Sequence, residues 1–176
     1  MSLECGSKII LVGNLYDTAR QRKNTHTEGT WDSNAHQHQD AHNNNKLGLA
    51  QKQLLYCRVG IGYHLQILPN GNIGGVHEPT EYCWLKVFSM QWGVVGIKGL
   101  KSNLYLCMSS AGIAWGSHFM AECLFREDME EDHYTTYASA SHPGLYLALS
   151  HNGQAKRGNT VQKENPCAHF LPRLQT

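Results

Sequence analysis

Short apolar runs separated by turn residues fill the chain from about Leu54 onward. Gly, Asn and Pro interrupt these runs about every 8–12 residues, which is the spacing of strands in sandwiches and barrels. No segment of any length has apolar residues at the 3.6-residue period of an amphipathic helix. The pattern therefore predicts an all-β domain.

One short pattern occurs three times along this domain, in residues 63–75, 104–116 and 145–157. Each copy has two apolar residues two positions apart, which form one buried face of a strand. Four residues later comes a Gly, the residue that best adopts the positive φ of a hairpin turn. The matching columns are Leu65, Leu106 and Leu147; Ile67, Met108 and Leu149; and Gly71, Gly112 and Gly153.

Three hairpin-bearing units of about 40 residues are too few for a propeller and too long for the rungs of a solenoid. A closed barrel with the three units around one axis fits the repeat. We therefore predict a β-trefoil of twelve strands with pseudo-threefold symmetry over residues 51–176.

Residues 1–50 differ in composition from the rest, and we interpret them as a flexible, disordered tail of unknown role. From Thr18 to about Lys46 the sequence is polar, with almost no aliphatic residues to offset the entropy of ordering. His36, His38 and His42 could suggest a metal site. Nothing nearby supplies further ligands or orienting partners, so a solvated tail is the favoured interpretation and we expect no metal.

Charge and hydropathy exclude several classes of protein. The net charge of +1 gives no general basic field, so we expect no nucleic-acid partner. No apolar run approaches the ~20 residues of a membrane span, so we expect no membrane insertion. The run Ile9–Val12 is also shorter than the apolar core of about 7–15 residues in a signal peptide. An export route is therefore not evident.

Six cysteines occur without a CxxC pair, which argues against a zinc finger or a thioredoxin-like site. A domain of this size does not need disulfides to fold, so we expect mostly buried or free thiols. Motifs of hydrolases, metalloproteases and P-loop enzymes are missing, and the Gly60 and Gly62 pair lacks the third Gly of a dinucleotide fingerprint. We expect no enzymatic activity and no cofactor.

Several strings in the domain resemble the fibroblast growth factors. They occur in order and with nearly constant spacing between Leu54 and Leu174. VGIGYHLQ and HFLPRL are most similar to the branch of fibroblast growth factors four, five and six. The resemblance implies a secreted, extracellular growth factor that binds and dimerises a fibroblast growth factor receptor tyrosine kinase, with a heparan sulfate proteoglycan supplying the co-ligand. The strings are residues 55–66 (LYCRVGIGYHLQ), 68–71 (LPNG), 122–127 (ECLFRE), 133–137 (HYTTY), 152–153 (NG), 156–158 (KRG) and 169–174 (HFLPRL).

The resemblance places a heparan sulfate site on one turn and its neighbours. Gly153 and Gly158 let backbone N–H groups approach an anion, and the two cations between them supply positive charge. Many family members carry Lys or Arg where this chain has His151, Gln154, Thr160 and Pro166, so we expect unusually weak heparin binding. An ordinary solvated turn is the alternative. The residues implied are Arg58, Asn152, Lys156, Arg157 and Lys163.

The resemblance also implies a receptor-binding face made of large side chains at strand ends and loops, where interface anchors are common. By itself, the acidic stretch 127–132 is typical of a solvated loop. Asp132 stands where the family often has Asn, and a carboxylate accepts but cannot donate a hydrogen bond. The residues implied are Tyr56, Glu127, Asp132, Tyr134 and Leu171.

Three alternatives share the fold. A trefoil lectin usually repeats a Gln-x-Trp element, whereas Gln91 and Trp92 are contiguous and occur once. A cytokine of the interleukin-1 type would lack the strings quoted above. An intracellular homologous factor without receptor activity would suit free cysteines and the missing signal peptide, although the strings favour the secreted branch.

Overall fold

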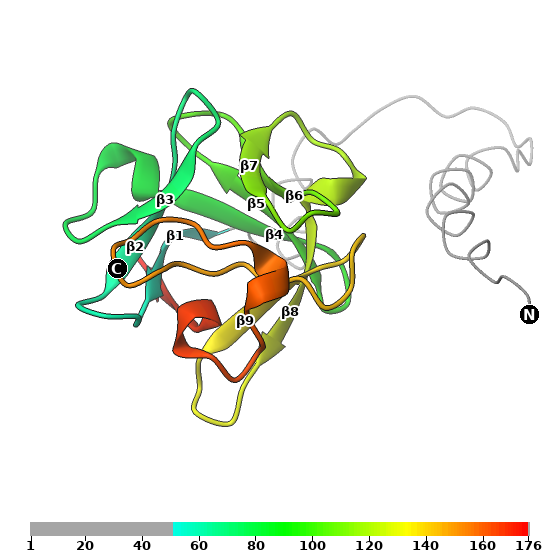
Figure 1. Cartoon of the computed structure of the whole chain (residues 1–176). Helices are drawn as coiled ribbons and strands as arrows, with labels where there is room; N and C mark the ends of the chain where they lie inside the picture. The colour runs from blue at the N-terminus through cyan, green and yellow to red at the C-terminus, as the bar shows by residue number, and fades with distance from the viewer. Residues whose placement is uncertain (1–50, 176) are drawn as a thin grey trace, which may run out of the picture. The chain divides into compact units, whose positions relative to one another are not determined.

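The computed structural model describes residues 51–175 (Figure 1). The predicted tail, with His36, His38, His42 and the run Ile9–Val12, lies outside the described residues, as does Cys5. Within residues 51–175 no helix has the length and apolar character needed to cross a membrane.

The regular elements of the described chain are strands and short 3-10 turns, which confirms the all-β prediction. The strands are β1 (Gln51–Cys57), β2 (Tyr63–Ile67), β3 (Ile73–Val76), β4 (Leu85–Gln91), β5 (Val94–Gly99), β6 (Tyr105–Met108), β7 (Ala114–Ser117), β8 (Leu124–Met129), β9 (Thr135–Ser139) and β10 (Phe170–Leu174). The 3-10 turns are η1 (Glu81–Cys83), η2 (Ala121–Cys123), η3 (Gly158–Thr160) and η4 (Pro166–Ala168).

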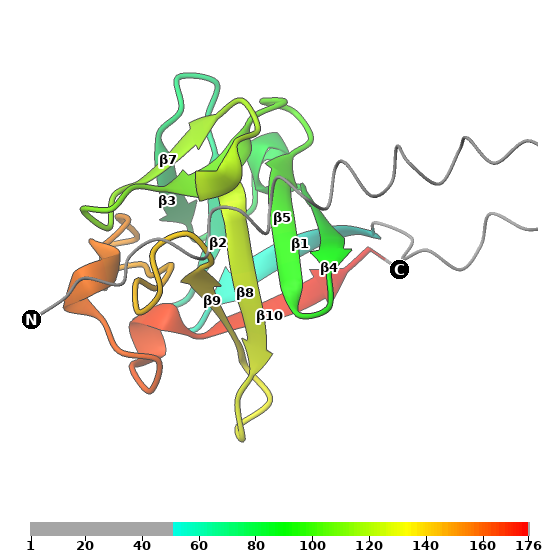
Figure 2. The ribbon, with the colours of Figure 1, turned by 90° about the vertical axis from the view of Figure 1, so that its right-hand side faces the viewer.

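Six strands close into a barrel. In the ring, β1 pairs with β4, β4 with β5, β5 with β8, β8 with β9, β9 with β10, and β10 again with β1, all antiparallel. Closure leaves none of the six as a free edge along its whole length. Figure 2 shows β5, β8, β1 and β10 running across the domain, with β3 and β7 at one end. The hairpins β2–β3 and β6–β7 extend from this barrel.

The three repeated turns interlock through a cycle of backbone hydrogen bonds. The N–H of Gly116 donates to the carbonyl of Gly71 at 2.7 Å, and that of Gly158 donates to Gly112 at 2.8 Å. The cycle closes when Gly75 donates to Gly153 at 2.6 Å. Each turn thus accepts from the next unit and the third unit binds the first, which is the relation that a pseudo-threefold axis requires.

Each turn also repeats the same internal geometry. Gly71, Gly112 and Gly153 have φ values of 84°, 77° and 80°, in the region that only Gly adopts without strain. The repeated apolar positions are all fully buried in the core, at 0% exposure. They are Leu65, Leu106 and Leu147 with Ile67, Met108 and Leu149.

The third hairpin differs from the prediction of twelve strands. Its two arms meet at an isolated bridge between Leu149 and Ala155, so residues 51–175 contain ten strands. Tyr146 N–H donates to the Gly158 carbonyl, but Gly158 N–H donates to Gly112 of the neighbouring unit instead of returning the bond. The arms therefore lie in hairpin register without forming a continuous ladder.

Cysteine chemistry agrees in part with the prediction. Cys57, Cys83 and Cys167 are buried free thiols. Burial raises the pKa of the Cys57 thiol to about 11, so this group stays protonated and unreactive at neutral pH. A disulfide joins Cys107 to Cys123, which the sequence did not reveal because no spacing rule pairs them.

Candidate functional site

Three of the predicted receptor-binding residues lie in a row across neighbouring strands. Tyr56 of β1 is the register partner of Leu171 in β10. Tyr134 directly precedes Thr135, which pairs with Phe170, so the same register places Tyr134 beside Leu171. All three residues of the row are half-buried, so part of each remains exposed at the surface.

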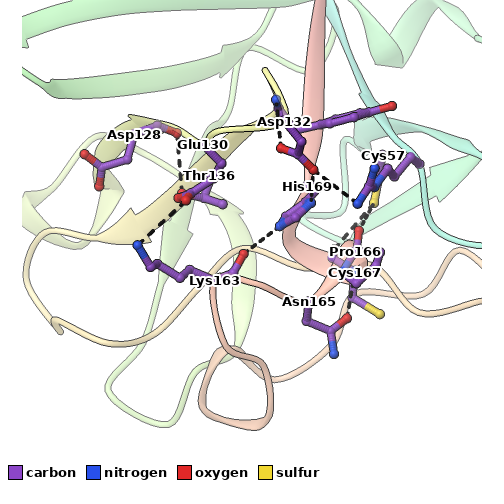
Figure 3. A network of polar contacts seen from close by, with 12 residues as sticks. Cys57, Asp128, Glu130, Asp132, Thr136, Lys163, Asn165, Pro166, Cys167 and His169 are labelled. Carbon is purple, nitrogen blue, oxygen red and sulfur yellow. Dashed lines mark hydrogen bonds and ion pairs between the residues drawn. The ribbon is translucent and has the colours of Figure 1, made fainter.

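A charged pair lies beside this row and contains residues that the sequence assigned to different sites. The Arg58 guanidinium is 3.2 Å from Asp132 Oδ2, and its central carbon is 4.5 Å from the centroid of the Tyr134 ring. Asp132 Oδ1 also accepts from the Tyr134 backbone N–H at 3.3 Å. We call Arg58, Asp132 and Tyr134 the Arg58 cluster. Its carboxylate is bound on two sides, which fixes the loop that carries Tyr134 (Figure 3).

Glu127 lies on β8, apart from the Arg58 cluster. Its register partner on β9 is Tyr137, whose buried hydroxyl donates to Glu127 Oε1 at 3.1 Å. Burial is the main cause that raises the pKa of Tyr137 well above its ordinary value, and the charge and hydrogen bond of Glu127 raise it further. The hydrogen bond therefore aims one carboxylate oxygen inward and leaves the other for a partner.

Replacing Tyr137 with Phe tests this pair. Because folded Tyr137 keeps its proton at pH values where an unfolded tyrosine ionises, its stabilisation is complete below about pH 10 and falls as the pH rises further. Urea unfolding of Tyr137→Phe should show a loss of about 1 kcal/mol at neutral pH. The variant should also lose less stability than the unmodified protein on raising the pH above about 10. If both proteins lose the same free energy of unfolding above about pH 10, the hydrogen bond between Tyr137 and Glu127 is contradicted.

The predicted glycan-binding residues divide into two groups. Lys156 and Arg157 lie in the arm after the third turn and make no ion pair among the described residues. Asn152 is exposed, and its Oδ1 accepts from Gln154 N–H within the turn. By contrast, Arg58 is paired with Asp132, and the Lys163 ammonium lies 3.7 Å from Glu130. The turn therefore offers two cations, and the other two are already held by carboxylates.

Comparison with known proteins decides the family. The family model described as Fibroblast growth factor matches residues 51–171, a range that includes all three repeated turns. The chain belongs to the fibroblast growth factor family. Relatives in the predicted branch agree with this assignment. The chain is 47% identical over 129 residues to fibroblast growth factor 4 of Bos taurus, and 45% identical over 130 residues to fibroblast growth factor 5 of Mus musculus.

The alignments leave part of each protein unmatched. They span 73% of this chain and 63% of the bovine fibroblast growth factor 4, and 69% of this chain and 49% of the murine fibroblast growth factor 5. The human fibroblast growth factor 4 is 45% identical over 129 residues, with 73% of this chain and 63% of the relative covered. This chain therefore matches less than two thirds of these relatives' length.

Sequence reasoning missed two features of this fibroblast growth factor domain. Trp92 is fully exposed, at 101%, at the tip of the β4–β5 hairpin, next to the point where Glu127 N–H donates to Gly93. His169, by contrast, is 5% exposed and stacks on Tyr134 with ring centroids 6.0 Å apart. A Trp placed directly before Gly in a predicted hairpin could have indicated that Trp92 is exposed. No local signal indicated the contacts of His169, because its partners come from distant segments.

Proposed function

We propose that this chain is a secreted growth factor that binds and dimerises a fibroblast growth factor receptor tyrosine kinase, with heparan sulfate as co-ligand. The observation that carries the proposal is the row of Tyr56, Leu171 and Tyr134 beside the Arg58 cluster. Family membership supports a growth factor.

The row has the chemistry of a protein-binding surface. Large aromatic side chains held rigid by their neighbours dominate binding energies because little side-chain entropy is lost on contact. Tyr56 is held by the Arg173 guanidinium, 4.1 Å from its ring centroid, and by the His64 ring at 5.3 Å. The Tyr134 ring contacts both Arg58 and His169. Both tyrosines are therefore fixed before any partner arrives.

The charges near the third turn support a weak polyanion site. Sulfates bind cations by charge-assisted hydrogen bonds, and salt screens the attraction. Lys156 and Arg157 are without carboxylate partners in the part of the chain that the structure describes, so a sulfated glycan can reach them without breaking an ion pair. Binding through Arg58 or Lys163 would compete with Asp132 or Glu130.

Replacing Lys156 and Arg157 together with Ala should lower the salt concentration at which the protein elutes from a heparin column. The reason is that each lost cation removes one salt-sensitive contact with the polyanion. The matched control is Lys86→Ala with Arg126→Ala, which removes the same charge from exposed positions on β4 and β8. Equal shifts for both pairs would indicate attraction by net charge alone and would reject the turn as the glycan site.

The disulfide between Cys107 and Cys123 supports secretion over the intracellular alternative. Disulfides persist in oxidising compartments and are rare in the cytosol. The free thiols do not argue against this, because Cys57, Cys83 and Cys167 are all buried. Mass spectrometry of the secreted protein after alkylation, with and without reduction, measures the pairing directly.

Binding to a purified receptor ectodomain tests the proposal. Surface plasmon resonance with the ectodomain immobilised should give saturable binding that strengthens when heparin is added. The lectin alternative predicts instead binding to neutral sugars on a glycan array and no response on the receptor surface.

A further inference from the structure

His169 is a buried, titratable side chain directly behind the Arg58 cluster. It precedes β10 and is 5% exposed. Its Nε2 lies 2.6 Å from the Lys163 carbonyl oxygen, and its Nδ1 lies 3.4 Å from Asp132 Oδ2. Its ring also stacks on Tyr134, with an interplanar angle of 24°. One imidazole thus contacts three groups around the loop 130–134 (Figure 3).

The Lys163 contact sets the tautomer of this ring. A carbonyl oxygen only accepts, so the proton of the neutral ring is on Nε2. Nδ1 then presents a lone pair toward a carboxylate oxygen, and it has no hydrogen-bond partner among the described residues. A buried ring nitrogen without a partner is unfavourable, and a proton on Nδ1 would turn this contact into a charge-assisted hydrogen bond.

We propose that His169 is a pH-sensitive positioning residue: protonation of Nδ1 binds Asp132 and fixes loop 130–134 and Tyr134 against β10. The one bond that forms is the Nδ1–H bond, whose proton comes from hydronium in the solvent and leaves water behind. The loop then has two cationic partners for Asp132, namely Arg58 and the imidazolium. Mild acidification therefore strengthens the arrangement of this face, whereas the neutral ring leaves Arg58 as the sole charged partner of Asp132 among residues 51–175.

The charged and titratable groups around the ring agree with this direction. From the β8–β9 connection come Asp132 and Tyr134, and Glu130 is neutralised by Lys163. From the end of β1 comes Arg58, whose charge is already paired with Asp132 and whose N–H donates to the His169 carbonyl at 3.4 Å. The neighbouring Cys57 thiol stays uncharged. Asp132 is thus the carboxylate that accepts a hydrogen bond from the protonated Nδ1 of His169.

NMR of the whole chain tests, without any receptor, whether protonation of His169 fixes loop 130–134. Ring ¹⁵N shifts should show His169 protonated on Nε2 alone at the upper end of a pH titration, and on both nitrogens at the lower end. The backbone amide of Tyr134 should shift with the same midpoint, because it donates to Asp132. His169→Gln keeps a donor for the Lys163 carbonyl but cannot titrate, so this coupled shift should vanish.

His133→Gln is the matched control, since His133 is an exposed titratable residue of the same loop. This variant should retain the coupled shift of Tyr134. A neutral ring protonated on Nδ1, or a Tyr134 amide that titrates identically in His169→Gln, would overturn the proposal.

The consequence for the receptor rests on the proposed function. Affinity should rise about threefold on acidification from pH 7.5 to 5.5 in the unmodified protein relative to His169→Gln. If the coupled shift of the Tyr134 amide is present but the receptor does not bind at either pH, the proposed function alone is rejected.

Discussion

Replacing Gly71 with Ala should lower the free energy of unfolding by about 2–4 kcal/mol, because the new methyl group is both strained and crowded. Gly71 has a φ of 84°, which an L-residue with a side chain rarely adopts. A Cβ there would lie 2.8 Å from the Gly116 carbonyl oxygen. The neighbouring unit cannot easily retreat, since Gly116 N–H donates to the Gly71 carbonyl. Urea unfolding measures the loss.

Gly144 provides the matched control for this substitution. It has nearly the same φ, 88°, but an added Cβ would meet no atom within 4 Å. Gly144→Ala should therefore cost only the conformational part, about 1 kcal/mol. Equal losses at the two positions would show that the contact between units contributes nothing, which would contradict the interlocked cycle of turns.

Replacing Tyr134 with Ala should weaken receptor binding by about 2 kcal/mol or more, which is roughly thirtyfold in the dissociation constant. The substitution removes the ring that both Arg58 and His169 contact. It also removes the aromatic end of the row formed with Leu171 and Tyr56. Surface plasmon resonance on the receptor ectodomain measures the change. An unchanged dissociation constant would refute the assigned face.

Two controls separate loss of the anchor from loss of structure. Tyr134→Phe keeps the ring and should retain most of the affinity. Ile113→Ala removes an apolar side chain that is 47% exposed, at the β6–β7 turn, and should leave binding unchanged. Circular dichroism of Tyr134→Ala should match that of the unmodified protein. If Ile113→Ala weakens binding as much as Tyr134→Ala does, the row is not the binding face.

The architecture was accessible from sequence because the repeat is local. Leu65, Leu106 and Leu147 recur with a Gly at a fixed distance. The strand and the turn of each unit can therefore be predicted from the residues of that unit alone. The strand count was not accessible in the same way. In the third hairpin Gly158 N–H donates to Gly112, in a unit distant in sequence, and not to Tyr146 in its own hairpin. Such competition is a tertiary property.

The site shows the same division. Resemblance placed Arg58 in the glycan site and Asp132 in the receptor site, while the structure joins them as one ion pair. Charges that lie 74 positions apart in the printed sequence, as these do, carry no local signal of contact. The contact of His169 with Asp132 escaped prediction for the same reason. The pairing of Cys107 with Cys123 escaped it because no spacing rule pairs them. The resemblance suggested which surfaces bind partners, and the fold determined which side chains remain available on them.

Receptor dimerisation on cells is the most direct test of a growth factor that acts through its surface. Cells expressing a fibroblast growth factor receptor but lacking heparan sulfate should be treated with the protein, with and without added heparin, and receptor pairs counted by cross-linking. We expect heparin-dependent dimers with the unmodified protein and very few with Tyr134→Ala. Absence of dimers with the unmodified protein under both conditions, or equal dimers with Tyr134→Ala, would contradict the account.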